Sequence, residues 1–124
     1  MIDFDTASFT KLSPWDVKEA IAELSGILLP DEQVLLAFKS VRDSVTFTSR
    51  RIVALNVQGI TGKKKDFTSL PYSKIQAFSV ETAGTWDRDS ELELWFSGLG
   101  KVKFNFASGV DVRGLNILIS ERLL

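Results

Sequence analysis

Residues 91–107 read ELELWFSGLGKVKFNFA, and in both halves of this stretch polar residues alternate with apolar ones. Alternation with a period of two predicts strands that turn one face to a core and the other to solvent. Residues 97–100 carry two glycines and favour a turn, so the stretch predicts an antiparallel hairpin. One face holds the apolar side chains Leu92, Leu94, Phe96, Val102, Phe104 and Phe106. Trp95 falls out of phase with that face and is predicted to point outward.

Five further runs of β-branched and aromatic residues precede this hairpin. They occupy residues 33–41, 43–49, 50–57, 65–70 and 75–83. Turn signals separate the runs at intervals that suit a succession of hairpins, and no helical spacing interrupts them. The sequence therefore predicts seven strands in all.

Helical spacing of apolar residues occurs before and after the strands. Ser13 as N-cap and Pro14 in the first turn predict a helix that closes between Gly26 and Pro30. Residues 109–124 predict a second helix at the end of the chain.

Three apolar residues lie outside the best stripes of these helices. Trp15 is expected to pack on Phe4 or Phe9, although an exposed Trp is also a typical interface anchor. Ile117 and Leu124 indicate either a second contact surface or a helix that is broadly buried over a sheet.

These elements together predict a mainly β fold. Seven antiparallel strands and one closing helix fit a partly open barrel of two bent sheets, with the helix capping one end. We expect this body to occupy residues 31–124, preceded by an N-terminal helical extension over residues 1–30.

The residues also resemble a known family. The most specific pieces are Arg42-Asp43, Thr48-Ser49-Arg50-Arg51, Gly59-Ile60-Thr61-Gly62-Lys63-Lys64, Leu70-Pro71-Tyr72 and Val80-Glu81-Thr82-Ala83-Gly84 with Asp87, Asp89 and Glu91. From about Asp31 to Leu124 the chain resembles the bacterial pleckstrin-homology-like (PH-like) family. The resemblance implies the seven-stranded, helix-capped fold and a tendency to form ring-like homo-oligomers, whereas it implies no defined molecular role.

Composition narrows the chemistry that the chain can perform. There is no cysteine and no histidine among the 124 residues, which excludes disulfides, thiolate nucleophiles and the commonest general base. We therefore expect that the protein is not an enzyme and that it binds no metal and no cofactor. The acidic start of the chain is unlike a signal peptide, and no run approaches the roughly 18 apolar residues of a membrane span. We therefore expect a cytoplasmic protein.

An acidic string at Asp87, Asp89 and Glu91 superficially resembles the opening of a calcium loop. The EF-hand pattern fails further along, because Leu92 stands where a glycine is needed and the flanks are strands. We expect these acids to form a solvated loop, in which Asp87 and Asp89 accept hydrogen bonds from nearby backbone N–H groups.

Basic residues provide one alternative function. Fifteen Lys and Arg against sixteen Asp and Glu give a net charge of -1, which offers no general attraction for nucleic acid or anionic membranes. Locally, Lys63, Lys64 and Lys65 in a Gly-rich hairpin, with Arg51, could form a weak anion patch. Neighbouring arginines such as Arg50 and Arg51 could bind a phosphate, but more often they satisfy the protein's own carboxylates and loop carbonyls. Lysines and aromatics of residues 101–106 alternate onto opposite faces, so we expect no nucleic-acid binding.

The sequence as a whole favours a non-catalytic module. We expect it to assemble into a homo-oligomer, in the form of a ring, and to serve as a protein-interaction scaffold for other proteins. The candidate interface residues are Trp15, Trp95, Ile117 and Leu124. The alternative is a peripheral module that recognises anionic lipid or phosphate through the basic hairpin, although we expect no membrane contact from a chain without a basic loop between its first two strands.

Overall fold

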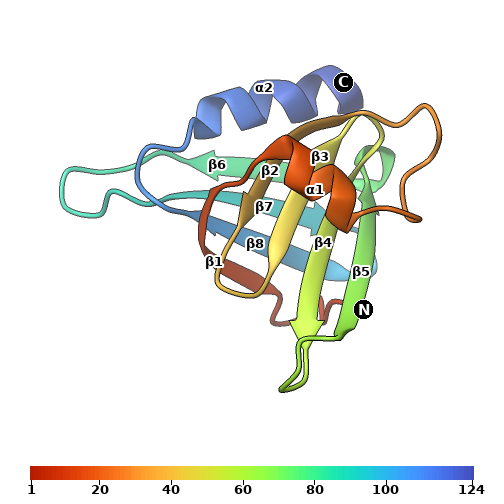
Figure 1. The fold of residues 1–124 in the computed structure, drawn as a ribbon. Coiled ribbons are helices and arrows are strands. Elements are labelled where there is room, and N and C mark those ends of the chain that lie inside the picture. Colours follow the sequence, from red (N-terminus) through yellow and green to blue (C-terminus); the bar gives the residue numbers. More distant parts are fainter.

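A computed structural model describes all residues 1–124 (Figure 1). Its elements in chain order are β1 (Ser8–Pro14), α1 (Val17–Glu23), β2 (Val34–Lys39), β3 (Ser44–Thr48), β4 (Arg51–Gln58), β5 (Lys64–Pro71), a 3-10 turn (Tyr72–Lys74), β6 (Ala77–Glu81), β7 (Ser90–Phe96), β8 (Gly100–Phe106) and α2 (Val112–Leu123). The fold is mainly β with a C-terminal helix, as the sequence predicts.

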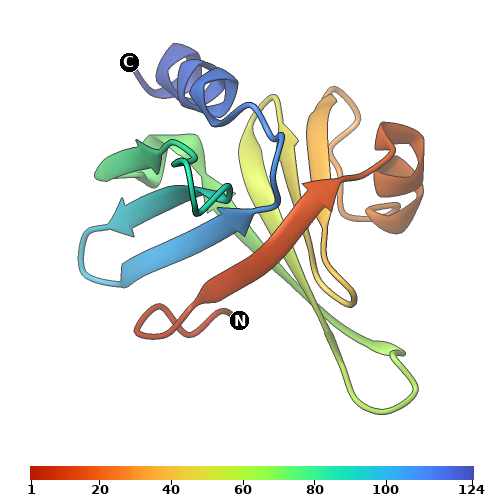
Figure 2. The ribbon, with the colours of Figure 1, turned by 90° about the vertical axis from the view of Figure 1, so that its left-hand side faces the viewer.

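The strands form one eight-stranded sheet in the order β5-β4-β3-β2-β1-β8-β7-β6. This differs from the expected seven antiparallel strands in two bent sheets, because eight strands form one curled sheet and one pair of strands is parallel. All seven expected strands are present, and the additional strand is β1, which pairs with β2 in antiparallel and with β8 in parallel orientation. Figure 2 shows β1 running between the two halves of the curled sheet and joining them.

An irregularity inside β1 explains why its sequence does not look like a strand. Phe9 and Leu12 are both buried in the core although they are three residues apart, which breaks the alternation of a regular strand. The register against β8 shifts between these two residues, and Lys11 has a φ of 55°, so a bulge restores the inward direction of Leu12. The sheet thus begins inside the segment for which we expected a helix.

The first helix is shorter than predicted. Ser13 and Pro14 belong to β1, and the N-cap is Asp16, whose carboxylate accepts a hydrogen bond from the Lys18 N–H at 2.7 Å. The helix ends at Glu23, because Leu24 already leaves helical geometry and Gly26 adopts a φ of 87°. Seven residues remain helical.

The main core lies on the concave face of the sheet. It is built from aromatic and aliphatic side chains that alternate along the strands, and the rings of Phe38 and Phe106 lie 5.0 Å apart across the two halves. Helix α2 covers this core with its buried stripe Val112, Leu115 and Ile119. Figure 1 shows α2 lying over one end of the sheet.

Helix α1 packs on the opposite face of the sheet. Ala37, Val53 and Leu55 are buried but lie outside the main core, because they alternate with the core residues of β2 and β4. Ala20 and Leu24 of the helical segment are buried there, and Glu23 forms an ion pair of 2.8 Å with Lys65 of β5. The N-terminal helix is thus held by its own subunit. Neither helix has the length and apolar character that crossing a membrane requires.

Candidate functional site

The two edge strands of the sheet are candidates for contact with other chains. β5 pairs only with β4, and β6 pairs only with β7, so each has one edge without a neighbouring strand. β5 carries Lys64 and Lys65 near one end, and lysines on an edge discourage pairing. β6 is short and has a single charged residue, Glu81, so its edge is the less protected of the two.

The four predicted interface residues do not form one patch. Trp95 is 48% exposed on the outward side of β7, opposite Ala77 of the edge strand β6. Ile117 is 55% exposed on α2, and Leu124 at the C-terminus is almost fully exposed. Trp15 lies after β1, in the other half of the sheet, as its backbone N–H donates to the Ala37 carbonyl. The apolar surface is therefore divided between separate regions of the molecule.

Trp15 has a contact that the sequence did not suggest. Its ring lies under the Lys39 ammonium, with Nζ 5.5 Å from the ring centroid, and its side chain is half-buried. The core partners of Phe4 and Phe9 are Phe96 and Phe104, in place of the expected contact with Trp15. A cation over the face of a Trp is a favourable electrostatic contact, and here it fixes Lys39 near the end of β2.

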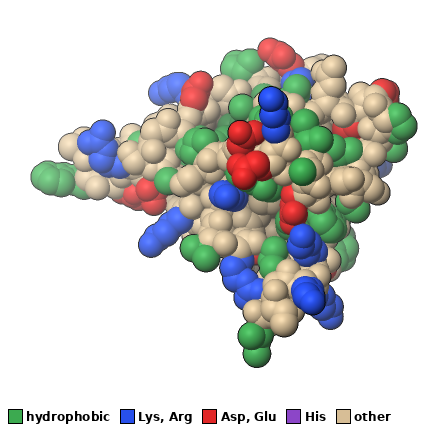
Figure 3. Space-filling view, viewed as in Figure 1, with side chains coloured by type: hydrophobic (Ala, Val, Ile, Leu, Met, Phe, Trp, Pro, Cys, Tyr) green, Lys and Arg blue, Asp and Glu red, His purple; other side chains and the backbone are tan.

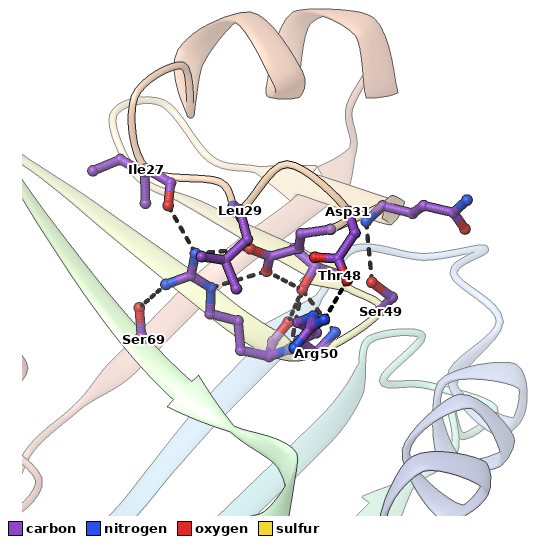
Figure 4. A network of polar contacts seen from close by, with 10 residues as sticks. Ile27, Leu29, Asp31, Thr48, Ser49, Arg50 and Ser69 are labelled. Carbon is purple, nitrogen blue, oxygen red and sulfur yellow. Dashed lines mark hydrogen bonds and ion pairs between the residues drawn. The ribbon is translucent and has the colours of Figure 1, made fainter.

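Arg51 lies in an internal network (Figure 4). Its Nε and Nη2 donate to the two Glu32 carboxylate oxygens at 2.9 and 2.8 Å, a bidentate pair in which the Glu32 side chain is fully buried. Nη2 also donates to the Ile27 carbonyl at 2.9 Å, and Nη1 donates to Ser69 Oγ at 2.8 Å. The guanidinium thus fastens the segment between α1 and β2 to strands β4 and β5.

Glu32 is the carboxylate at the centre of this network. The hydrogen bonds from Arg51 lower its pKa to about 2, and they outweigh burial, which acts in the opposite direction. Thr48 Oγ1 donates to Glu32 at 2.6 Å, and the Leu29 N–H donates at 3.1 Å. Tyr72 donates its hydroxyl to the Thr48 carbonyl at 2.7 Å. Several residues of the Thr48-Ser49-Arg50-Arg51 and Leu70-Pro71-Tyr72 motifs therefore have a structural role.

The structure does not bring Arg51 near the lysines of the expected anion patch. Arg51 pairs with Pro71 at one end of the β4–β5 ladder, whereas Gln58 pairs with Lys64 at the other. From Arg51 to Gln58 the extended strand makes seven residue steps, which is about 23 Å. Lys63 and Lys64 are exposed at the hairpin, while Lys65 is paired with Glu23.

A different arginine accompanies those lysines. Arg42, in the turn between β2 and β3, donates from Nη2 to the Gly59 carbonyl of the β4–β5 turn. Sequence reasoning missed this contact because it joins two turns that are far apart in the chain, and no local signal marks it. Figure 3 shows Lys and Arg side chains gathered at the lower end of the molecule, around the β4–β5 hairpin.

The acidic string forms part of the β6–β7 loop. Asp87 accepts a hydrogen bond from the Asp89 N–H at 3.1 Å, and its carbonyl accepts one from the Gly84 N–H at 2.7 Å. Glu91 lies on β7 and faces Lys103 of β8 at 3.7 Å. The Asp87 carboxylate thus accepts a backbone N–H as expected, whereas the Asp89 carboxylate accepts no hydrogen bond. The acidic residues do not gather into a group of three that could hold a metal ion.

Nearly the whole chain is similar in sequence to known proteins. A family model described as bacterial PH domain matches residues 3–123. Two proteins of Bacillus subtilis strain 168, both described as uncharacterized, are similar. YjqA is 57% identical over 76 residues, which is 61% of each chain, and YozO is 27% identical over 101 residues, which is 82% of this chain and 87% of YozO. The matched part thus spans less than two thirds of YjqA.

Solved structures show the same fold. A DUF1696 family protein with a pleckstrin-homology domain from Shewanella loihica PV-4 superposes with a TM-score of 0.81 at 38% identity, over 93% of this chain and 99% of the other. A pleckstrin homology domain from Shewanella amazonensis SB2B has a TM-score of 0.68 at 44% identity, over 89% and 90%. A PH-domain-containing protein from Exiguobacterium sibiricum 255-15 has a TM-score of 0.65 at 22% identity, and the match covers 88% of this chain and 58% of that one.

Proposed function

The chain belongs to the bacterial PH domain family, and from that premise we propose that it is a non-catalytic module that assembles with copies of itself and serves as a scaffold for other proteins. The observation that carries the proposal is the open eight-stranded sheet. Each of its edge strands, β5 and β6, has one edge without a neighbouring strand in the subunit. Unpaired strand edges are templates for contact with another chain.

The two edges differ, and this difference determines the kind of assembly. A contact between β6 of one subunit and the Phe67–Pro71 end of β5 of the next would be heterologous, because two different surfaces meet. Repeated heterologous contacts close into a ring when the rotation between neighbours allows it, and otherwise extend into a filament. The ring that the family resemblance implies is the closed form.

Exposed apolar side chains support such a contact. Trp95 stands beside β6, Ile117 lies on α2, which contacts β6 and β7, and Leu124 directly follows the end of that helix. Large aromatic residues commonly provide the anchors of protein interfaces. The separation of Trp15 from this region suits a heterologous contact, which uses two distinct surfaces of each subunit.

The buried carboxylate supports the non-catalytic part of the proposal. Glu32 is the one charged residue that is buried. A general base that works at neutral pH would need a pKa near 7. The pKa of Glu32 is instead lowered to about 2 by Arg51, and its oxygens are occupied by hydrogen bonds. This carboxylate stabilises the fold and is poorly suited to proton transfer.

Size-exclusion chromatography with light scattering tests the proposal. The expected molar mass is an integral multiple, of several copies, of the 13.8 kDa chain. A mass of one chain at every concentration would remove the self-assembly claim.

A second candidate function has one observation in its favour. Lys63 and Lys64 are exposed at the β4–β5 turn, Arg42 is tied to the same turn, and Ile60 projects fully exposed from it. Basic and apolar side chains together can engage an anionic lipid surface. We expect no sedimentation with anionic vesicles at physiological salt. Robust sedimentation that is lost when Lys63, Lys64 and Lys65 are all changed to Glu would favour this second function.

A further inference from the structure

A small cleft of about 170 Å³ lies where the β6–β7 loop meets the start of α2. Figure 1 shows these two segments on the same side of the molecule. The polar residues of the lining are Thr82, Arg88, Ser90, Asp111 and Arg113. The volume is below the usual range of sites for drug-sized ligands, so the cleft suits a single small chemical group.

One residue of the lining carries a buried hydroxyl that has no partner. Ser90 begins β7 on the same face as the core residues Leu92 and Leu94, so its side chain points inward at the cleft. The residue is only 3% exposed, and its Oγ forms no hydrogen bond within the subunit. Because an unpaired buried hydroxyl costs free energy, its presence at a cleft indicates a place for a hydrogen-bonding group from outside the chain.

The first turn of α2 adds an independent observation. The Arg113 N–H has no hydrogen-bond partner, whereas the Gly114 N–H donates to Asp111 Oδ1 at 3.0 Å. The turn holds no acidic residue, and its one charged side chain is that of Arg113. A cation at the N-terminus of a helix opposes the helix dipole, so Arg113 does not stabilise the helix by its charge. Both the free N–H and the guanidinium favour a negatively charged group at this point.

The cations of the cleft are not neutralised within the subunit. Neither Arg88 nor Arg113 forms an ion pair. The one carboxylate of the lining, that of Asp111, is already engaged as the N-cap of α2. Two arginines and one aspartate give the lining side chains a net formal charge of +1. The cleft therefore matches a ligand group that carries one negative charge.

We infer that this cleft binds one carboxylate group. The guanidinium of Arg88 or Arg113 can donate two parallel hydrogen bonds to a carboxylate. The hydroxyls of Thr82 and Ser90 supply further donors. Three side chains of the lining are apolar, namely those of Ala83, Val110 and Val112. They suit the hydrocarbon that bears the carboxylate, whereas a phosphate monoester, with about two negative charges, matches the net charge of +1 less well.

The carboxylate has two possible sources, a small carboxylic acid and the C-terminus of a peptide chain. Both present the same group to the cleft, so the experiment has to distinguish them. The inference goes beyond the proposed self-assembly and does not depend on it, because every residue of the cleft belongs to one subunit.

The test is an NMR titration of the uniformly labelled full chain with sodium propionate at constant ionic strength. We expect saturable shifts of the backbone amides in residues 82–90 and 109–114. Sodium phosphate should bind at these residues more weakly than propionate. The inference is contradicted if propionate gives no saturable shifts in the two segments, or if phosphate binds more tightly.

Two variants separate the contacts with the ligand from the stability of the fold. Ser90→Ala should keep or raise the Tm, because it removes an unpaired buried hydroxyl, and it should weaken propionate binding about tenfold. Arg113→Gln should also keep the Tm, because it removes a cation from the N-terminus of α2, and should weaken binding by a similar factor. Lys64→Gln removes an exposed charge outside the cleft and is the matched control. Parent affinity in Ser90→Ala or in Arg113→Gln, or equal weakening in Lys64→Gln, would overturn the inference.

A pair of peptides distinguishes the source of the carboxylate. Acetylated tetra-alanine with a free C-terminal carboxylate is compared with the same peptide as its C-terminal amide. If the free acid binds more tightly than propionate and the amide does not bind, the ligand is the terminus of a peptide chain. If the free acid binds no more tightly than propionate, the ligand is a small carboxylic acid. Binding of the amide at residues 82–90 and 109–114 would contradict the inference, because the amide carries no negative charge.

Discussion

At the scale of single residues, two neighbouring arginines show how far the sequence can predict a site. Arg50 and Arg51 could bind an anion or satisfy the protein's own carboxylates, and the structure places both on internal acids, Asp31 and Glu32. Composition and spacing predicted that interaction type. They could not predict which carboxylate each arginine meets, because Glu32 reaches Arg51 only after the α1–β2 segment has folded over the sheet.

The different burial of these two ion pairs leads to a prediction. Arg51→Ala should destabilise the fold by about 3–5 kcal/mol, because it leaves the buried Glu32 carboxylate without its partner. Arg50→Ala is the matched control, and it should cost under about 1 kcal/mol because both side chains of its pair are mostly solvent-exposed. Urea unfolding followed by circular dichroism measures both values. Equal losses in the two variants would contradict the structural role assigned to Arg51.

Acid dependence provides a second prediction at this scale. The pKa of Glu32 is lowered in the folded state from 4.5 to about 2, so its contribution to stability is present above pH 4.5 and is lost as the pH falls toward 2. The Asp66 carboxylate, whose pKa is lowered by the N-terminal ammonium, acts in the same direction. The free energy of unfolding should therefore fall between about pH 5 and pH 2 by roughly 3 kcal/mol from Glu32 alone.

The variant Glu32→Gln separates that contribution from the others. It should be less stable than the parent chain at pH 7, and its stability should depend less steeply on pH in the same interval. Urea unfolding at a series of pH values gives the two slopes. Parallel slopes would show that Glu32 does not titrate in this way.

At the scale of elements, strands with regular alternation were predictable and the one irregular strand was not. Residues 91–107 alternate strictly, and β7 and β8 follow them closely. β1 escapes the same reasoning because its bulge places Phe9 and Leu12 three residues apart on the same side. Its pairing with β8 is also between segments nearly 100 residues apart, which no local pattern reveals.

The candidate sites divide in the same manner. Lys63, Lys64 and Lys65 form a local basic run, and the sequence predicted their place in a hairpin correctly. Arg42 gains its significance from a long-range contact with the Gly59 carbonyl, so it could not be identified without the structure.

The exposed edge of β6 leads to a prediction at the element scale. Ala77 and Ser79 are exposed on this strand, so changing both to Lys should leave the subunit folded. The new charges would oppose pairing with a neighbouring edge. We expect light scattering to give a smaller mass for this variant than for the parent.

Its control is Ser97→Lys, which adds a charge to the exposed β7–β8 turn. This variant should keep the parent mass. An unchanged mass for the Ala77→Lys, Ser79→Lys variant would move the contact away from the β6 edge.

At the scale of the whole molecule, a curled sheet is covered on its concave face by α2 and on its opposite face by α1. The outer edges of β5 and β6 remain unpaired. Both helices are held by their own subunit, so neither needs a neighbour to bury its apolar stripe. The unpaired strand edges that a partner could cover are those of β5 and β6, with exposed apolar residues beside β6. We therefore propose that assembly uses the edges of the sheet.

Native mass spectrometry of the full chain tests this central claim most directly, because it counts the subunits in each species. Heterologous edge contacts that close into a ring predict one dominant stoichiometry, which stays the same on dilution until the ring dissociates. Open contacts would instead give a ladder of masses in steps of 13.8 kDa, and would exclude the closed ring. A spectrum that holds the single chain alone, at concentrations where light scattering also gives one chain, would contradict the account.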